Sequence, residues 1–491
     1  MWYRVTNVLV LGLALAQVAL AQQPGEISYH DESAMPAGIE GQRIQSLIDV
    51  FNSGEPDRVR QFIEEQCTGW FHEIPMEEHL EVFSNVRHEW GGVDFHSVRS
   101  YVPERTQETV VILKDRNFGA WRAFSVRFED SAERRLTGLR LNDARTPSNV
   151  DEPALTRRAA LAMMEEVIER VCENAAFSGT ALIASGDDVL GSYFCGQASK
   201  RFDVPNNIDT KFNLGSMNKM FTATAVAQLV ERGLVAYDDP ISRYVDETWL
   251  PKEITDRVTV HHLLSHTSGL GDYFTDEFWE SSRLKWREID AFKELAQGQE
   301  LEFAPGERFR YSNLGMLIAG VVIESASGQS YFDYIRENIY EPAGMTNSDS
   351  YEIDEPVPNL AIGYLRDPES EYGYRDNNLL HVAKGGPAGG GYSTVGDLFR
   401  FSRALVTGKL VSEASLETMW TPKSDAGYGY GFGVGEGPAG TVVGHSGGFP
   451  GINGELAIYV DAGYTVAVLS NYSNAASPLC NRLQQLVERI Q

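Results

Sequence analysis

Positive charge is scarce in this sequence of 491 residues. It contains 42 lysines and arginines against 69 aspartates and glutamates, so its formal net charge is −27. A phosphate backbone repels so acidic a chain, which argues against a nucleic-acid partner. The rest of the composition, with 42% hydrophobic and 23% charged residues, is that of a globular protein. It excludes a disordered chain, a collagen-like fibre and a coiled coil.

Long hydrophobic runs are also lacking. Beyond residue 21, no apolar run reaches the about 18 residues of a membrane-spanning helix. The apolar run at 8–20 is too short to span a membrane; it follows Arg4 and ends in the small residues Ala19-Leu20-Ala21. We therefore predict a signal peptide over 1–21 and an exported protein, periplasmic or secreted, without stable membrane insertion. An uncleaved anchor is the alternative.

Cysteine is sparse as well, with four residues in the whole chain. In an oxidising compartment, four cysteines allow three full pairings, and the sequence does not choose among them. Four buried free thiols are the alternative, because a chain of this length needs no disulfide to be stable. The cysteines are Cys67, Cys172, Cys195 and Cys480.

Residues 144–153 have the composition of a linker and separate two predicted domains. The first domain, 36–143, is expected to be a small α+β unit in which helices precede strands. Apolar residues keep a helical spacing around 44–51, and a second helix is expected over 56–66. Strands are expected over 95–102, 108–114, 120–128 and 136–141. This order resembles the nuclear transport factor 2-like (NTF2-like) fold, and the resemblance covers this domain alone.

The second predicted domain, 154–491, carries strand patterns near both of its ends. A helix over 154–172 and a hairpin of 180–185 with 189–195 open it, and a helical middle follows to about residue 380. Strands over 441–444, 455–460 and 464–469 and a helix over 478–490 close it. We therefore predict an α+β fold in which one antiparallel sheet, built from both ends of the domain, packs against a helical subdomain.

Ser216 and Lys219 form an S-x-x-K motif at the start of an alanine-rich apolar run. Residues at i and i+3 of a helix share a face, so the hydroxyl and the amine can meet. A free lysine has a pKa near 10.4 and is a poor base at neutral pH. Burial and the positive end of the helix dipole lower that pKa, and a neutral amine can then accept the serine proton. The motif predicts a serine nucleophile activated by lysine.

A second S-x-x-K, at Ser282 and Lys285, lies in a charged stretch. A lysine in such surroundings stays protonated, so we interpret this motif as a solvated surface.

Two further elements support the S-x-x-K of Ser216 and Lys219. Tyr311-Ser312-Asn313 precedes an apolar helix, and His445-Ser446-Gly447-Gly448 continues a predicted strand.

The ordered set S-x-x-K, Y-x-N and H-x-G resembles the superfamily of serine β-lactamases, penicillin-binding proteins and esterases, closest to its class C-like branch. The runs Leu263 to Leu270, Phe303 to Gly306 and Gly389 to Thr394 resemble that branch too. The resemblance spans about 170–490. It implies a penicillin-recognising fold and acyl transfer through an acyl-enzyme, without cofactor or metal, on a small-molecule or peptide substrate.

The resemblance also implies a role for each matching residue. Ser216 would be the nucleophile, Lys219 its base and Tyr311 the proton relay to the leaving group. Asn313 would contact substrate, and the backbone N–H groups of Ser216 and Gly448 would bind the oxyanion, where one donor typically contributes about 10²–10³ in rate. The sequence leaves the oligomeric state open.

His445 departs from the pattern of the lactamases, which have a lysine there. An imidazole anchors a substrate carboxylate less firmly than an ammonium does, and β-lactams carry such a carboxylate. We therefore favour hydrolysis of small esters or amides, D-amino-acid peptides included. A D-Ala-D-Ala carboxypeptidase, a weak β-lactamase and a penicillin-binding sensor that is acylated without turnover are the alternatives. We also expect acidification through about pH 6.5 to charge His445.

Three rival motifs are weaker. Gly444 to Gly448 fits G-x-S-x-G, but strands rather than a helix are expected after it, and no histidine follows His445. Gly386 to Ser393 has Tyr392 where a phosphate-binding loop needs lysine. His262 and His266 lack a third ligand, so we interpret them as histidines that brace the core or a loop.

Overall fold

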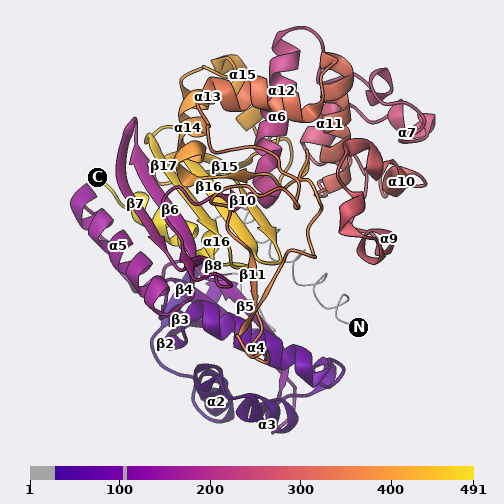
Figure 1. Ribbon diagram of the computed structural model, residues 1–491. Helices are drawn as coiled ribbons and strands as arrows, with labels where there is room; N and C mark the ends of the chain where they lie inside the picture. The colour runs from indigo at the N-terminus through magenta and orange to yellow at the C-terminus, as the bar shows by residue number, and fades with distance from the viewer. Residues whose placement is uncertain (1–27, 103–107) are drawn as a thin grey trace. The chain divides into compact units, whose positions relative to one another are not determined.

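Residues 28–102 and 108–491 are described by the structure, a computed structural model. They divide into two units, one of residues 28–176 with 489–491 and one of Phe177–Glu488 (Figure 1). The predicted signal peptide, 1–21, lies outside the described residues. None of the helices within the described part is long and apolar enough to cross a membrane.

The first unit is a five-stranded antiparallel sheet with helices packed on it. The strands follow chain order, β1-β2-β3-β4-β5. The core joins helices to sheet: the Phe51 ring lies 5.8 Å from that of Trp90 and 5.4 Å from that of Phe124. The elements are β1 Ser28–Glu32, α2 Ile39–Ser53, α3 Pro56–Gln66, α4 Met76–Trp90, β2 Val93–Val102, β3 Thr109–Asp115, β4 Trp121–Phe128, β5 Leu136–Asp143 and α5 Arg157–Glu173.

The expected order of helices and then a strand meander is confirmed in this unit, with two additions. Sequence reasoning missed β1, which pairs with β2, and α4. Helix α4 buries only His79, Phe83 and Trp90, so its sequence shows only a weak apolar periodicity. The NTF2-like resemblance stays a prediction.

In the second unit, a six-stranded antiparallel sheet has the order β14-β15-β16-β17-β6-β7. Strand β17 pairs with β6, with Ser470 opposite Gly179, so the last strands of the chain pair with the first hairpin of the unit. The prediction of one sheet built from both ends is confirmed. The strands are β6 Gly179–Ser185, β7 Asp188–Cys195, β14 Gly433–Gly437, β15 Gly440–Phe449, β16 Ile452–Tyr459 and β17 Tyr464–Ser470.

Helices cover this sheet and form a subdomain beside it. Helix α14 (Val395–Val406) packs on β6 and β17, and α16 (Ala476–Val487) packs on β16 and β17. Figure 1 shows α6 (Asn218–Glu231), α11 (Asn313–Ser327) and α12 (Tyr331–Ile335) together on one side of the sheet. Helices α6 and α11 pack against each other, and α6 is buried from Asn218 to Leu229. The lysine of the S-x-x-K motif therefore lies in an environment of low dielectric constant.

The described cysteines fall into two kinds. Cys172 and Cys195 are disulfide-bonded, whereas Cys67 and Cys480 are buried free thiols. Burial raises the pKa of Cys67 to about 12, so this thiol is unreactive.

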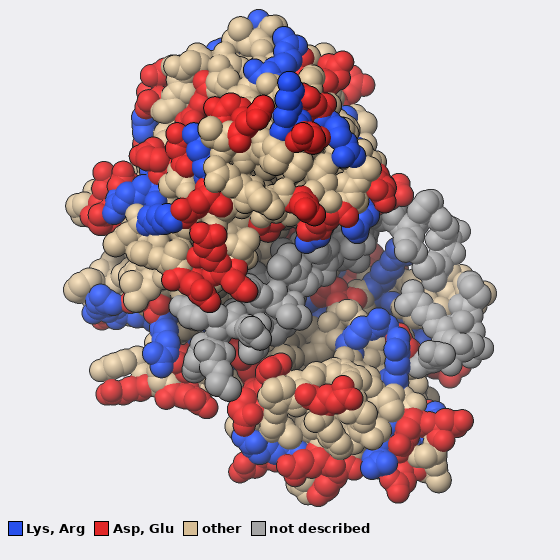
Figure 2. Space-filling view, turned by 90° about the vertical axis from the view of Figure 1, so that its right-hand side faces the viewer, with Lys and Arg blue, Asp and Glu red and all other residues tan. Residues whose placement is uncertain are grey.

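Acidic and basic side chains are interspersed on the face that Figure 2 shows, where the described residues form no continuous basic surface.

Candidate active site

Ser216 lies in a 3-10 turn, Gly215–Met217, that runs directly into α6. Asn213 Oδ1 accepts a hydrogen bond from the Gly215 N–H at 2.9 Å and holds the start of this turn. Gly215 has φ +50°, and a Cβ there would lie 3.1 Å from the backbone nitrogen of Gly448. A glycine therefore permits both the turn and the close approach of β15.

Lys219 is fully buried, one helical turn after Ser216, with 0% of its surface exposed. Its Nζ lies 3.1 Å from Ser216 Oγ and 2.8 Å from Asn313 Oδ1, and it also donates to the Ala388 carbonyl. Burial lowers the pKa of Lys219 to about 7, and the charge of Asp272 acts in the opposite direction. Around neutral pH, the amine is therefore available as a base.

A row of backbone carbonyls receives the polar side chains of α6. Asn218 Nδ2 donates to Gly386 O at 2.7 Å, and Thr222 Oγ1 donates to Pro387 O at 2.8 Å. The Ala388 carbonyl, next along the chain, accepts from Lys219. The segment 386–388 thus holds the lysine amine through Ala388 and the helix around it through Gly386 and Pro387.

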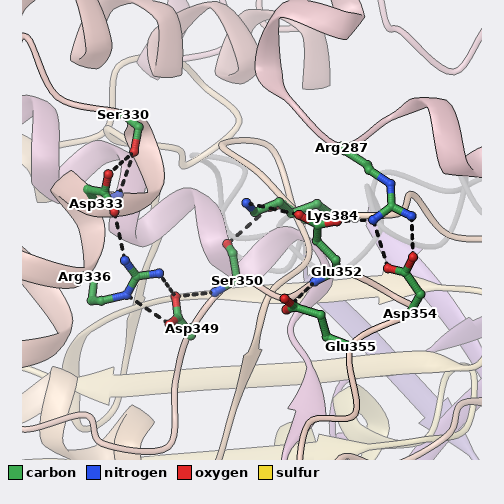
Figure 3. Close-up of polar contacts among 11 residues, drawn as sticks. Arg287, Ser330, Asp333, Arg336, Asp349, Ser350, Glu352, Asp354, Glu355 and Lys384 are labelled. Atoms are coloured by element: carbon green, nitrogen blue, oxygen red, sulfur yellow. Dashed lines mark hydrogen bonds and ion pairs between the residues drawn. The ribbon is translucent and has the colours of Figure 1, made fainter.

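Figure 3 shows the polar contacts that anchor the chain just before this segment. Ser350 Oγ donates to Gly385 O at 3.2 Å, and the Lys384 ammonium lies 4.0 Å from Glu352. Arg287 forms an ion pair with Asp354 at 2.7 Å in the same network. These contacts hold the chain directly before the three residues whose carbonyls accept hydrogen bonds from α6.

Tyr311 and Asn313 flank the N-terminus of α11, where Ser312 Oγ caps the helix by accepting from Gly315 N at 2.8 Å. The Tyr311 hydroxyl is hydrogen-bonded to Ser216, and Lys219 Nζ lies 4.7 Å from the centre of the Tyr311 ring. Burial raises the pKa of Tyr311, while the bond with Ser216 lowers it. The structure thus brings the serine, the lysine and the tyrosine into mutual contact.

Strand β15 closes the other side of Ser216. A Cβ at Gly447 would overlap the Leu214 carbonyl oxygen and lie 3.1 Å from Ser216 N. Gly448 is exposed, and a Cβ there would have no neighbour within 4 Å. The edge of β15 beside Ser216 is therefore open to a substrate. Backbone N–H groups of β15 and of the turn that carries Ser216 lie at this edge.

His445, on the same strand, is held as a neutral ring. Its Nε2 accepts from the Tyr428 hydroxyl at 2.9 Å, and its Nδ1 donates to the Ser446 carbonyl. Burial, together with the charge of Lys219, lowers the pKa of His445 to about 3. The expectation that mild acid would charge His445 is therefore wrong, because a ring packed against Tyr311 and Tyr428 cannot be solvated as a cation.

Sequence reasoning did not place three residues at the site: His266, Asp272 and Tyr428. The His266 ring packs 4.3 Å from that of Tyr311, and its Nδ1 accepts from Ser312 N at 3.2 Å. Its interpretation as a bracing residue is confirmed, but its place beside Tyr311 was not expected. Asp272 lies two residues after the run Leu263 to Leu270, and Tyr428 lies in a glycine-tyrosine run, but neither run marks these residues as part of the site.

The other motifs lie apart from this chemistry. Ser282 and Lys285 are exposed, and Lys285 pairs with Glu294, as expected of a solvated surface. His262 Nδ1 accepts from Thr259 N at 3.1 Å within a capping box at the start of α8 (Val260–Leu264). Gly444 to Gly448 lies inside β15 and is followed by β16, so the strand-turn-helix of a nucleophile elbow is absent there.

The sequence matches the Beta-lactamase family over residues 164–489. The chain belongs to the beta-lactamase family. It is 34% identical to Penicillin-binding protein 4* of Bacillus subtilis over 63% of this chain and 71% of that protein. It is 32% identical to Esterase EstB of Burkholderia gladioli over 41% of this chain and 54% of that protein.

Solved structures agree with the family assignment. A penicillin-binding protein from Bacillus halodurans has a TM-score of 0.60 and 31% identity, covering 65% of this chain and 98% of its own. A D-stereospecific amidohydrolase from Streptomyces sp. has a TM-score of 0.53 and 26% identity, covering 65% and 97%. This member of the beta-lactamase family is a serine hydrolase whose relatives include esterases and amidases.

Proposed function

We propose that this protein is an exported hydrolase that acts on small esters or amides through an acyl-enzyme on Ser216. The observation that carries the proposal is a fully buried Lys219 amine 3.1 Å from Ser216 Oγ, with a pKa lowered to about 7. A neutral amine has two N–H donors and one lone pair. With the donors directed at Asn313 Oδ1 and Ala388 O, the lone pair is left for the Ser216 proton.

In the first half-reaction, Ser216 Oγ attacks the substrate carbonyl and its proton passes to Lys219 Nζ. The N–H groups of Ser216 and Gly448 stabilise the oxyanion. The bond to the leaving group then breaks, and the Tyr311 hydroxyl donates a proton to the departing alkoxide or amine and regains one from Lys219. In the second half, water attacks the acyl-enzyme, the same groups move its protons, and the acid product leaves with Ser216 restored.

The neutral state of His445 supports esters and amides without a carboxylate as the preferred substrates, because the site then offers no full positive charge on β15. Peptides or amides of D-amino acids are the second candidate. The similarity to a D-stereospecific amidohydrolase favours them. Export rests on the apolar run at 8–20.

Labelling with a fluorophosphonate, followed by peptide mapping, tests the site. We expect the label on Ser216, and we expect Lys219→Ala to lose it because the alcohol needs the neighbouring amine. Lys285→Ala, in the second S-x-x-K, is the matched control and should be labelled as the wild type is. A label on Ser282 or Ser446 would overturn the assignment.

A further inference from the structure

Asp272 extends the hydrogen-bonded chain of the site by one residue beyond Asn313. Lys219 Nζ donates to Asn313 Oδ1 at 2.8 Å, and Asn313 Nδ2 donates to Asp272 Oδ2 at 2.7 Å. A carboxylate only accepts hydrogen bonds. It therefore obliges the amide of Asn313 to turn its nitrogen toward Asp272 and its oxygen toward the lysine.

The loop that carries Asp272 is itself fixed to the start of α11. The other carboxylate oxygen, Oδ1, accepts from Phe274 N at 3.1 Å. The carbonyl of Gly271 accepts from Ser312 Oγ, the helix cap, at 2.6 Å. Since Asn313 is the first residue of α11, the carboxylate and the amide it holds are anchored to the same helix end.

We propose that Asp272 is a positioning residue of this site: by orienting the Asn313 amide, it keeps the lone pair of Lys219 directed at Ser216. The inference rests on the proposed function of Ser216 and Lys219. If the amide turned round, its NH₂ group would donate toward Nζ. It would then compete with the Ser216 hydroxyl for the single lone pair of the neutral amine.

Burial lowers the pKa of Lys219, and the negative charge of Asp272 raises it. Burial raises the pKa of Asp272, and its hydrogen bonds with Phe274 and Asn313 and the charge of Lys219 lower it. The other titratable groups that face the pair are Tyr273, Tyr311, His266 and His445. Burial raises the pKa of both tyrosines and lowers that of both histidines, so all four are neutral at pH 7.

Two substitutions separate orientation from charge. Asp272→Asn keeps the shape and an oxygen that can accept from Asn313 Nδ2, but it removes the charge. Asp272→Ala removes both. Asp276→Asn, which neutralises an exposed acid at the start of α9 (Asp276–Glu280), is the matched control. The measurement is kcat and KM for 4-nitrophenyl acetate across pH 5–9, with thermal melting of each variant.

We expect Asp272→Asn to move the acid limb of kcat/KM down by about one pH unit, because loss of the negative charge disfavours the ammonium of Lys219. Its plateau kcat should stay within about threefold of the wild type. Asp272→Ala should show the same shift and a further fall in kcat of about tenfold, with little change in KM, because the amide is no longer held. A purely structural role would lower melting temperature and leave the limb in place.

If folded Asp272→Asn has the same acid limb of kcat/KM as the wild type, the charge effect is overturned. If folded Asp272→Ala has the kcat of the wild type, the orienting role is overturned. If Asp272→Ala does not fold, Asp272→Ser takes its place, since it likewise lacks an acceptor in the same position. Failure of the proposed function is distinguishable, because the wild type itself would then not be labelled at Ser216 by the fluorophosphonate.

Discussion

His445 stands where the pattern of the lactamases has a lysine. Its ring is neutral because burial lowers its pKa to about 3, and Tyr428 occupies its Nε2. Acidification therefore does not supply a cation at this position. It instead protonates Lys219, whose pKa lies at about 7, and removes the base.

Replacing His445 with lysine is expected to favour β-lactams over neutral esters. The ordinary pKa of lysine, near 10.4, lies well above that of histidine, so a lysine keeps its charge where burial makes histidine neutral. Its ammonium would add one charge-assisted hydrogen bond to the substrate carboxylate, about 1–3 kcal/mol. We expect kcat/KM for a penicillin to rise by about 5- to 150-fold. A neutral ester, measured in both proteins, is the internal control and should change little. Lactamase-like efficiency in the wild type would contradict the argument from the missing lysine.

At the scale of elements, the site depends on how closely β15 approaches the turn that carries Ser216. Gly447 has no side chain where the Leu214 carbonyl and the Ser216 nitrogen come near. The strand and the turn therefore hold their backbone N–H groups at a common edge. The carbonyls of residues 386–388 hold Lys219 and its helix. Asn313, at the start of α11, contacts Lys219 as well, so four separate segments define the site.

Gly447→Ala should separate β15 from the turn and displace the oxyanion donors. We expect a loss of fluorophosphonate labelling rate of about 10²-fold or more and a destabilisation of about 1–3 kcal/mol. Gly396→Ala in α14 is the matched control, because its nearest neighbour would be at 3.6 Å, an ordinary contact. Labelling rates and thermal melts are the readouts. A Gly447→Ala protein that behaves like the control would show that the close approach is unimportant.

At the scale of the whole molecule, every residue of the proposed site lies in the second unit, and the family match covers 164–489. We expect residues 154–491 alone to fold under oxidising conditions and to hydrolyse a small chromogenic ester. This segment keeps Cys172 as well as Cys195, both of which are disulfide-bonded. Circular dichroism and ester turnover are the measurements. A folded but inactive segment would mean that residues 36–143 contribute to the site.

The sequence alone determined most strands of the two sheets and the order of the motifs. Apolar periodicity placed α3, β2 to β7, β16 and β17 within a few residues, because an element that buries one face repeats its apolar residues with the period of that element. It missed β1 and β14. S-x-x-K predicted that Ser216 and Lys219 would meet, because three residues of helix fix their separation. The fold class was also determined, since strands at both ends of one domain must pair with each other.

Only the tertiary structure decided the protonation states and the residues behind the motifs. The pKa of His445 depends on burial and on the charge of Lys219, which is far from it in the chain. Asp272 reaches Lys219 through Asn313, and Ala388 reaches it through a carbonyl that any residue could supply. Desolvation and long-range hydrogen bonds arise from packing between distant segments, so no local pattern of residue types records them.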